Sequence, residues 1–212
     1  MERIYQKTSF NEIPWNFETP PDVLVGLVED GKVKPCEALD LGCGTGNYSI
    51  YLATMGFNIT GIDISPTAIR IAQENAKKKG VKCNFFVADA LNEMNQVKST
   101  FDFVFDWELL HHIFPEQRRT FVENVYAKLN QGGKYLSVCF NEKDNSFGGS
   151  GKYRKTRLDT ILYFSSKKEI KNLFRPYFNI SELKIIRIRG KPESHLVNYA
   201  FLEKRIRYNP LE

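Results

Sequence analysis

The stretch that decides the fold is Ala38-Leu39-Asp40-Leu41-Gly42-Cys43-Gly44-Thr45-Gly46-Asn47. Its apolar start predicts a buried strand, and the pattern that follows Asn47 predicts a helix. Three glycines at alternate positions join the two, and glycine lets the backbone turn sharply and approach a ligand closely. The stretch therefore predicts a nucleotide-like ligand at the N-terminus of a helix, in the first strand-to-helix turn of an α/β fold.

Outward from this turn, segments with strand and helix character alternate, which is typical of a doubly wound parallel sheet with helices on both faces. Seven strands are expected, at 38–41, 58–63, 83–88, 101–106, 134–140, 180–188 and 196–203. Helices are expected at 48–55, 66–79, 115–129 and from Ser166 onward, the last one beginning with an S-x-x-E capping box. The turn 130–133 is expected to separate the third helix from the fifth strand.

The length of 212 residues fits one α/β domain, 1–212. We expect residues 1–36 to form a cap over the ligand, 37–140 the ligand-binding core, and 141–205 a lid-like loop at 141–165, the last helix and a terminal strand hairpin. Residues 211–212 resemble a tag scar. Four cysteines without metal-site spacing, together with the absence of an apolar leader or membrane span, predict a cytoplasmic protein that binds no metal.

Two cofactor classes use a glycine loop in this position. A dinucleotide site requires Gly or Ala where this chain has Asn47, and it places a diphosphate at the helix N-terminus. Asp40 directly before the loop would repel a diphosphate, whereas it suits a ligand that carries an ammonium group. Asp63 ends the second strand, where a carboxylate can accept hydrogen bonds from ribose hydroxyls.

The run Asp40-Leu41-Gly42-Cys43-Gly44-Thr45-Gly46 resembles motif I of the class I S-adenosylmethionine-dependent methyltransferases. Later landmarks of that family follow in the same order, at 61–65, 88–90, 101–112 and 129–134. The resemblance implies a Rossmann-like sheet whose last strand is antiparallel, and it implies S-adenosylmethionine as cofactor, with S-adenosylhomocysteine as product. The implied cofactor-binding residues are Trp15, Asp40, Gly42, Cys43, Gly44, Gly46, Asp63, Ile64, Asp89, Ala90 and Asp106.

Within this set, the resemblance places Asp40 and the Gly42 backbone at the methionine ammonium and Asp63 at the ribose diol. It places Ile64 at the adenine ring and Asp89 at the exocyclic amine of adenine. Two alternatives stay open, because Asp89 could instead be a helix N-cap beside Ala90 and Leu91, and Asp63 could cap the helix that begins at residue 66.

A further likeness concerns the segment ahead of the glycine loop. Ile13-Pro14-Trp15-Asn16-Phe17 with the following pair of prolines resembles the opening of the small-molecule branch, which contains thiopurine, thiol, halide and tellurite-resistance methyltransferases. In that branch the segment folds over the cofactor, so Trp15 would face the sulfonium through a cation–π attraction. The alternative is that Trp15 anchors the N-terminus in the core.

The acceptor is predicted to be a small molecule. The Asn/Asp-Pro-Pro motif of amino-methyltransferases that act on nucleic acid bases is absent, because the position reads Asp106-Trp107-Glu108-Leu109. Nucleic acid is therefore not the expected partner, although residues 150–212 hold 15 Lys and Arg against 6 Asp and Glu. Two other functions stay open, which are methylation of RNA or protein and regulation by cofactor binding without turnover.

Ligands of open α/β sheets bind at the carboxyl ends of the parallel strands. A hairpin through 189–194 would bring basic residues and His195 to that edge, where the 141–165 loop could join them. This geometry favours an anionic or polarizable nucleophile such as a thiolate, and the alternative is a solvated basic hairpin. The candidate substrate-binding residues are Trp107, Tyr153, Arg154, Arg189 and His195.

His111 and His112 follow the fourth strand, where the family lines its acceptor pocket. Adjacent side chains on a helix diverge by about 100°, so we expect at most one of them to point inward. Packing or hydrogen bonding is the favoured role for this pair, with general-base catalysis as the alternative.

Overall fold

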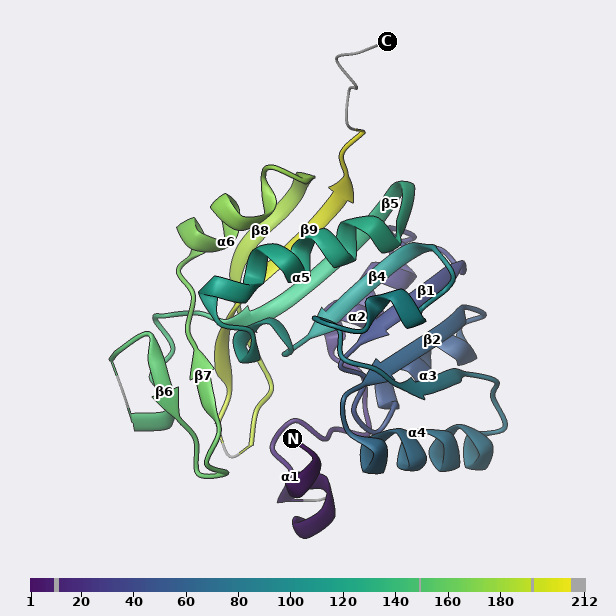
Figure 1. Ribbon diagram of the computed structural model, residues 1–212, viewed down its shortest axis with the longest axis horizontal. Coiled ribbons are helices and arrows are strands. Elements are labelled where there is room, and N and C mark those ends of the chain that lie inside the picture. Colours follow the sequence, from purple (N-terminus) through teal and green to yellow (C-terminus); the bar gives the residue numbers. More distant parts are fainter. Residues whose placement is uncertain (10–11, 149, 192, 207–212) are drawn as a thin grey trace.

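The computed structural model describes residues 1–9, 12–148, 150–191 and 193–206. The scar predicted at 211–212 lies outside these residues. The main sheet has seven strands in the order β3-β2-β1-β4-β5-β9-β8 (Figure 1). Strands β1 to β5 pair in parallel, and β9 runs antiparallel to both of its neighbours, β5 and β8. The doubly wound sheet with an antiparallel last strand is thereby confirmed.

The seven predicted strands are all present, with ends that differ by a few residues. Their bounds are β1 (Glu37–Leu41), β2 (Asn58–Asp63), β3 (Asn84–Val87), β4 (Phe101–Trp107), β5 (Leu129–Phe140), β8 (Phe178–Ile188) and β9 (His195–Lys204). The predicted helices are α3 (Asn47–Thr54), α4 (Pro66–Lys79), α5 (Pro115–Lys128) and α6 (Lys167–Phe174). Only the turn at 130–133 is misplaced, because β5 already begins at Leu129, where it pairs with Phe101.

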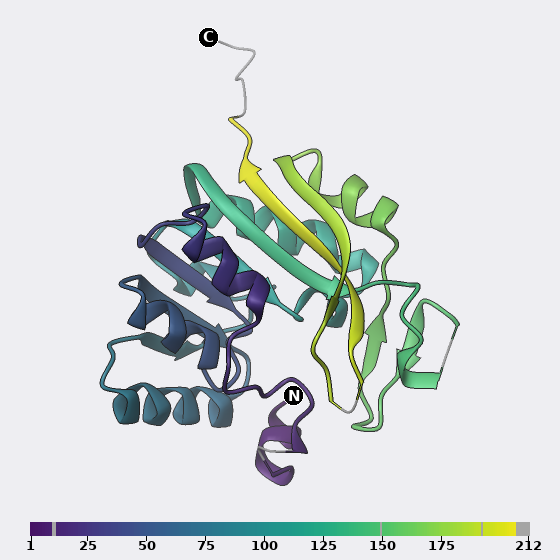
Figure 2. The same ribbon diagram turned by 180° about the vertical axis from the view of Figure 1, so that it is seen from behind.

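Two apolar cores lie on opposite faces of the sheet because strand side chains alternate between faces. On one face, α5 and α6 pack Phe121, Val125 and Phe174 against strand residues such as Leu39 and Val104 (Figure 1). On the other face, α2 (Asp22–Glu29) and α3 cover a core that includes Leu24, Leu52, Ala38, Phe103 and Leu136 (Figure 2). Ala38 and Leu39, which are adjacent in β1, therefore belong to the two different cores.

The N-terminal region contains structure that the sequence pattern did not predict. Besides α2, a short helix α1 (Glu2–Lys7) packs against the start of α4. The carboxylate of Glu2 accepts hydrogen bonds from Ser65 Oγ and from Thr67 Oγ1 and N at the N-terminus of α4. These bonds lower the pKa of Glu2 to about 2. The helix α1 is therefore docked by polar contacts on the same helix that the glycine loop approaches.

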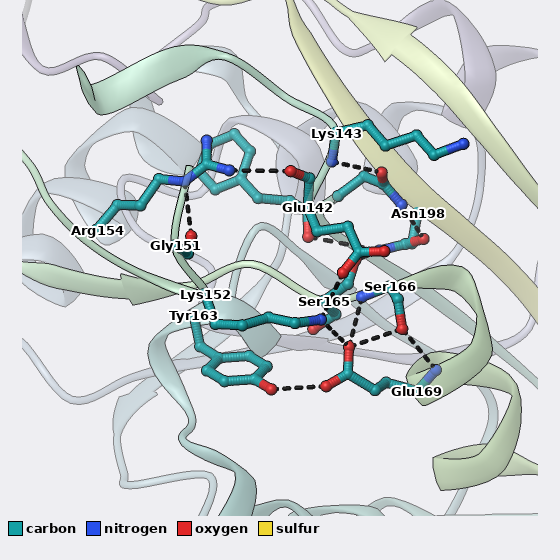
Figure 3. Close-up of polar contacts among 12 residues, drawn as sticks. Glu142, Lys143, Gly151, Lys152, Arg154, Tyr163, Ser165, Ser166, Glu169 and Asn198 are labelled. Atoms are coloured by element: carbon teal, nitrogen blue, oxygen red, sulfur yellow. Dashed lines mark hydrogen bonds and ion pairs between the residues drawn. The ribbon is translucent and has the colours of Figure 1, made fainter. Parts of the chain in front are cut away.

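The region 141–165, predicted as a loop, folds into a second sheet of β6 (Tyr153–Lys155) and β7 (Ile161–Tyr163). Figure 3 shows the polar contacts that fix it. Lys152 pairs with Glu142 at 2.6 Å and with Glu169 at 2.5 Å. Glu169 also completes the predicted capping box with Ser166. One lysine thus ties this region to the start of α6.

The small sheet, the hairpin between β8 and β9, and α1 all lie beyond the same edge of the main sheet (Figures 1 and 2). This edge holds the carboxyl ends of the parallel strands, where a switch in strand order between β1 and β4 opens a crevice for ligands. Among the described residues, no helix has the length and apolarity required to cross a membrane.

Candidate active site

A cavity of about 1240 Å³ lies at the carboxyl ends of β1, β2 and β4. Pockets for a single drug-sized ligand are about 300–1000 Å³, so this cavity has room for two ligands side by side. We call one end the glycine-loop end, lined by Asp40, Gly42, Gly44, Asp63, Ile64 and Asp89. We call the other the hairpin end, lined by Glu108, His111, Phe140, Phe147, Leu162 and His195.

The glycine loop is shaped by hydrogen bonds from β2. The amides of Gly42 and Cys43 both donate to the carbonyl of Ile62, at 2.8 and 2.9 Å. The amide of Gly44 donates to Asp63 Oδ2 at 3.0 Å, while Ser65 N donates to Oδ1 at 2.9 Å. Asp63 therefore supports the loop and still lines the cavity, whereas Ser65 is the N-cap of α4, so the capping alternative for Asp63 is wrong.

Gly44 has a positive φ of 54° and faces Tyr5 of α1 closely. A Cβ at this position would lie 2.9 Å from the Tyr5 hydroxyl oxygen. The same hydroxyl accepts a hydrogen bond from Trp15 Nε1 at 2.9 Å. Trp15 thus lines the cavity and is also pinned to α1, so the cavity-facing and anchoring roles weighed for it coexist.

Asp40 is the buried acid of the glycine-loop end, with 3% of its surface exposed. Ser49 Oγ donates to Asp40 Oδ2 at 2.7 Å, and no Lys or Arg within the described residues forms an ion pair with this carboxylate. Burial raises the pKa of Asp40 to about 7. A buried carboxylate without a cation, open to a cavity, is complementary to a cationic ligand group.

The adjoining wall of this end combines one apolar and one polar residue. Ile64 follows β2 and is 55% exposed, although it lines the cavity. Asp89 lines the cavity as well, but its oxygens accept from Leu91 N and Asn92 Nδ2, each at 2.8 Å. Asp89 therefore stabilises a turn after β3, where the alternative interpretation expected a helix N-cap, and it remains at the cavity wall beside Ala90.

Several predicted residues do not line the cavity. Gly46 packs into the fold instead, because a Cβ there would lie 2.8 Å from Phe85 and 2.9 Å from Ala72. Asp106 is fully buried and accepts from Tyr135 Oη and from Leu110 N, at 2.5 and 3.1 Å, so it fixes the turn after β4.

Tyr153 and Arg154 are also outside the lining, contrary to their predicted place at the mouth of the pocket. Tyr153 is half-exposed and packs edge-on against Tyr163. The Arg154 guanidinium is buried 3.9 Å from the Phe164 ring centroid and donates to backbone carbonyls, including those of Glu142 and Gly151 (Figure 3). Arg154 is therefore a structural residue that organises the segment after β5.

Both His111 and His112 line the cavity, so the expectation that at most one points inward is wrong. They lie in a short 3-10 turn, η3 (Leu110–His112), with ring centroids 4.7 Å apart. His111 stacks on Phe140 at 4.4 Å, and its buried Nδ1 has no hydrogen-bond partner among the described residues. Burial holds the pKa of His111 well below its usual range, so its ring is neutral.

Glu108 is an acidic cavity residue that sequence reasoning did not select. It has a φ of 65°, a left-handed conformation that non-glycine residues rarely adopt, and its amide donates to Val138 O at 2.8 Å. Burial raises the pKa of Glu108 to about 7. Its sequence signal is an acid directly after β4, beside Trp107, which also lines the cavity.

Basic side chains of the β8–β9 hairpin meet the N-terminal segment over the cavity. Arg189 and Lys191 lie 4.9 and 4.7 Å from the Phe17 ring centroid, and Lys191 Nζ donates to Asn16 O at 2.8 Å. Asn16 Oδ1 in turn accepts from Thr45 Oγ1 at 2.7 Å. The predicted cap therefore connects the hairpin to the glycine loop. No cluster of potential metal ligands occurs within the described parts of the chain.

Comparison with known proteins shows which proteins this fold and glycine loop resemble. Residues 38–133 match the family described as a methyltransferase domain. A solved structure from work on the conversion of a disulfide bond into a thioacetal group during echinomycin biosynthesis superposes with a TM-score of 0.82 and 22% identity. It covers 98% of this chain and 92% of that one. The segment that contains the glycine loop thus matches a methyltransferase domain, and the likeness in fold extends over nearly the whole chain.

Among curated relatives, the 2-heptyl-1-hydroxyquinolin-4(1H)-one methyltransferase of Mycobacteroides abscessus is 31% identical over 61% of this chain and 56% of its own length. The probable thiol methyltransferase 2 of Arabidopsis thaliana is 27% identical over 64% of this chain and 60% of its own. The chain thus spans little more than half the length of these relatives.

Proposed function

We propose that this chain transfers a methyl group from S-adenosylmethionine to a small-molecule nucleophile, with sulfur or a polarizable anion as the favoured acceptor atom. The observation that supports it most strongly is the buried Asp40 carboxylate, which lacks a cation and opens into the cavity beside the glycine loop. The methionine ammonium of the cofactor is the group that matches it.

The residues at the glycine-loop end fit this cofactor. Gly42 and Gly44 have positive φ angles and no side chain to fill the cavity, while Asp63 at the neighbouring strand end has acceptor oxygens suited to a ribose diol. The exposed Ile64 side chain offers an apolar surface for an adenine ring. Asp40 would bind the ammonium, and Trp15 would line the space for a sulfonium, whose charge an aromatic face attracts.

When bound, the cofactor supplies an activated methyl group, so the task of the protein is alignment and exclusion of water. Trp15, Phe17 and the hairpin residues Arg189 and Lys191 cover the cavity from one side. Phe140, Phe147 and Leu162 give the hairpin end an apolar wall. We infer that an acceptor enters this end, where Glu108, His111 and His195 face it.

The preference for sulfur rests on the apolar and aromatic character of the hairpin end, which suits a polarizable atom better than a strongly hydrated one. The relatives are consistent with it, since one is named a probable thiol methyltransferase and another structure comes from work on disulfide conversion. The cytoplasmic location and the single-domain organisation remain predictions from the sequence, as does the absence of a nucleic-acid partner.

A methyl-transfer screen tests the proposal. Thiols, halides, chalcogen oxyanions, amines, carboxylates and an RNA pool are incubated with radiolabelled S-adenosylmethionine and the purified protein. We expect turnover with at least one thiol or polarizable anion and none with RNA. Turnover confined to RNA, with binding that weakens steeply as salt rises, would overturn the proposal.

A further inference from the structure

We propose that His195 is the general base of the acceptor site, held in its working tautomer by the positioning residues Asp144 and Ser146. This inference rests on the proposed function and narrows it. The acceptor is a protic nucleophile that loses its proton to the enzyme, such as an alkyl thiol, and not an anion that is already formed in solution.

His195 is the first residue of β9 and stands at the hairpin end of the cavity with 7% of its surface exposed. Its ring is wedged between two aromatic side chains. Phe147 stacks on it with centroids 5.7 Å apart and an interplanar angle of 18°, and Phe140 meets it edge-on at 5.0 Å. The ring therefore has one fixed orientation rather than several rotamers.

One edge of the ring faces a buried polar pair. His195 Nδ1 lies 2.7 Å from Ser146 Oγ and 3.8 Å from Asp144 Oδ1. Asp144 is 4% exposed and accepts from Ser146 N at 2.8 Å and from Leu196 N. Burial raises the pKa of Asp144, but these bonds and the nearby imidazole outweigh it and hold the carboxyl well below its usual pKa.

An ionised carboxylate beside Nδ1 favours the tautomer that carries its proton on Nδ1. That N–H then donates to Ser146 Oγ, and Nε2 keeps a lone pair. An acid next to one imidazole nitrogen thereby selects the basic nitrogen on the other side of the ring. This is the orienting role that an aspartate has in catalytic triads.

The opposite edge of the ring, which carries Nε2, packs close to Gly190, and His195 lines the cavity. A Cβ at Gly190 would lie 2.4 Å from Nε2, so glycine at this position makes room for the ring edge. No hydrogen bond to Nε2 occurs among the described residues of the site. The charged and titratable groups that face His195 are Glu108 after β4, His111 in η3, and Asp144, while Arg189 and Lys191 of the same hairpin contact Phe17.

The step balances with groups that are present. Nε2 takes the proton of the acceptor X–H bond, and the electron pair of that bond stays on X and forms the new bond to the methyl carbon. The pair of the broken carbon–sulfur bond remains on the sulfur of the donor. The imidazolium then returns its proton to solvent when the methylated product leaves, so no oxidant or further reactant is required.

The first test reads the tautomer directly and does not depend on turnover. The chain has three histidines, so nitrogen-15 spectra can be assigned with His111→Gln, His112→Gln and His195→Gln variants. At about pH 8, we expect His195 protonated on Nδ1 with a free Nε2. Asp144→Asn and Ser146→Ala should both shift it toward the other tautomer. A wild-type His195 protonated on Nε2 would overturn the proposal.

The second test uses two probes, 2-mercaptoethanol as a protic acceptor and iodide as a preformed anion. We expect His195→Gln to slow methylation of the thiol about 10²-fold near neutral pH. The loss should shrink as rising pH ionises the thiol in solution, and near neutral pH it should exceed the loss with iodide, which has no proton to give up. An equal loss with both probes, or no loss with either, would contradict a general-base role.

Calorimetry with S-adenosylhomocysteine distinguishes a failure of the proposed function from a failure of the general-base proposal. If wild-type protein binds no S-adenosylhomocysteine, the proposed function fails regardless of the tautomer. If it binds normally and His195 carries its proton on Nε2, only the general-base proposal fails. Turnover of iodide without any turnover of thiols in the wild type would also count against a proton-accepting His195.

Discussion

The carboxylate of Asp63 at the end of β2 accepts a hydrogen bond from the amide of Gly44 in the loop after β1, at 3.0 Å. The same side chain accepts from Ser65 N at 2.9 Å. One residue therefore fixes the glycine loop and the entrance to α4 while it lines the cavity. The position of the loop and the affinity for a ribose-containing ligand are coupled through this side chain.

Replacing Asp63 should accordingly affect both binding and stability. In Asp63→Ala the amides of Gly44 and Ser65 lose their partner, which costs about 1–3 kcal/mol for a buried unsatisfied group. We expect weaker binding of S-adenosylhomocysteine by calorimetry and a lower melting temperature. Asp102→Ala, an exposed aspartate at the start of β4, serves as the control and should bind like wild type. Unchanged affinity in Asp63→Ala would show that the ribose lies elsewhere.

The raised pKa of Asp40 predicts a pH dependence of cofactor binding. Burial raises this pKa to about 7 in the ligand-free protein, so part of the population is protonated at neutral pH. A ligand ammonium favours the ionised carboxylate, and binding therefore releases a proton. We expect the affinity for S-adenosylhomocysteine to fall as pH drops below about 7, by up to tenfold per pH unit.

This pH dependence is measured by fluorescence titration between about pH 5 and 8, with Asp40→Asn as the matched variant. The variant should bind weakly, and its affinity should lack the step near neutral pH. An affinity of the wild type that is flat over this range would contradict an ionised Asp40 as the ammonium partner.

The raised pKa of Asp40 also predicts that the ligand-free protein becomes less stable as pH rises, whereas its affinity for the ligand increases. The pKa of this carboxyl is raised from 3.8 in the unfolded chain to about 7 in the fold. Its contribution to stability is therefore full below about pH 4 and is lost as pH rises through about 7, by on the order of 4 kcal/mol at most. Asp40→Asn should thus melt at a higher temperature than ligand-free wild type at about pH 8, and the two should converge in acid. A variant less stable at pH 8 would exclude this explanation.

Arg154 provides a prediction about the segment between β5 and α6. Its guanidinium donates to the backbone carbonyls of Glu142 and Gly151 (Figure 3) and to that of Ser146, among others. Arg154→Met would leave buried carbonyls unsatisfied, and we expect a loss of about 2–4 kcal/mol in urea unfolding. Hydrogen exchange at 142–146 should accelerate. The exposed Arg157→Met is the control, and equal stability of the two variants would refute a structural Arg154.

Much of the fold follows from local sequence signals. The helix α4 has a serine N-cap, proline at its first position and glycine directly after its end, and its bounds were predicted without error. The β6–β7 sheet was missed because its strands have three residues each and are stabilised by contacts from distant segments, such as Lys152 with Glu169. Strands this short lack an alternating pattern long enough to identify.

The glycine-loop end was predictable for a similar reason, because its residues belong to one contiguous motif and to the ends of neighbouring strands. Gly46 and Asp106 share those motifs but serve the packing of Ala72 and the turn at Leu110. The hairpin end was less accessible to sequence reasoning. Asp144 and His195 are about fifty residues apart and meet only because β9 returns beside β5.

The most direct test of the central claim is calorimetric titration of S-adenosylhomocysteine into the wild-type protein and Asp40→Asn, side by side at about pH 8. We predict saturable binding to one site in the wild type and affinity at least about tenfold lower in the variant, because the buried carboxylate that pairs with the ligand ammonium is lost. Absence of binding to the wild type, or equal affinity in both proteins, would contradict the assignment of this cavity to S-adenosylmethionine.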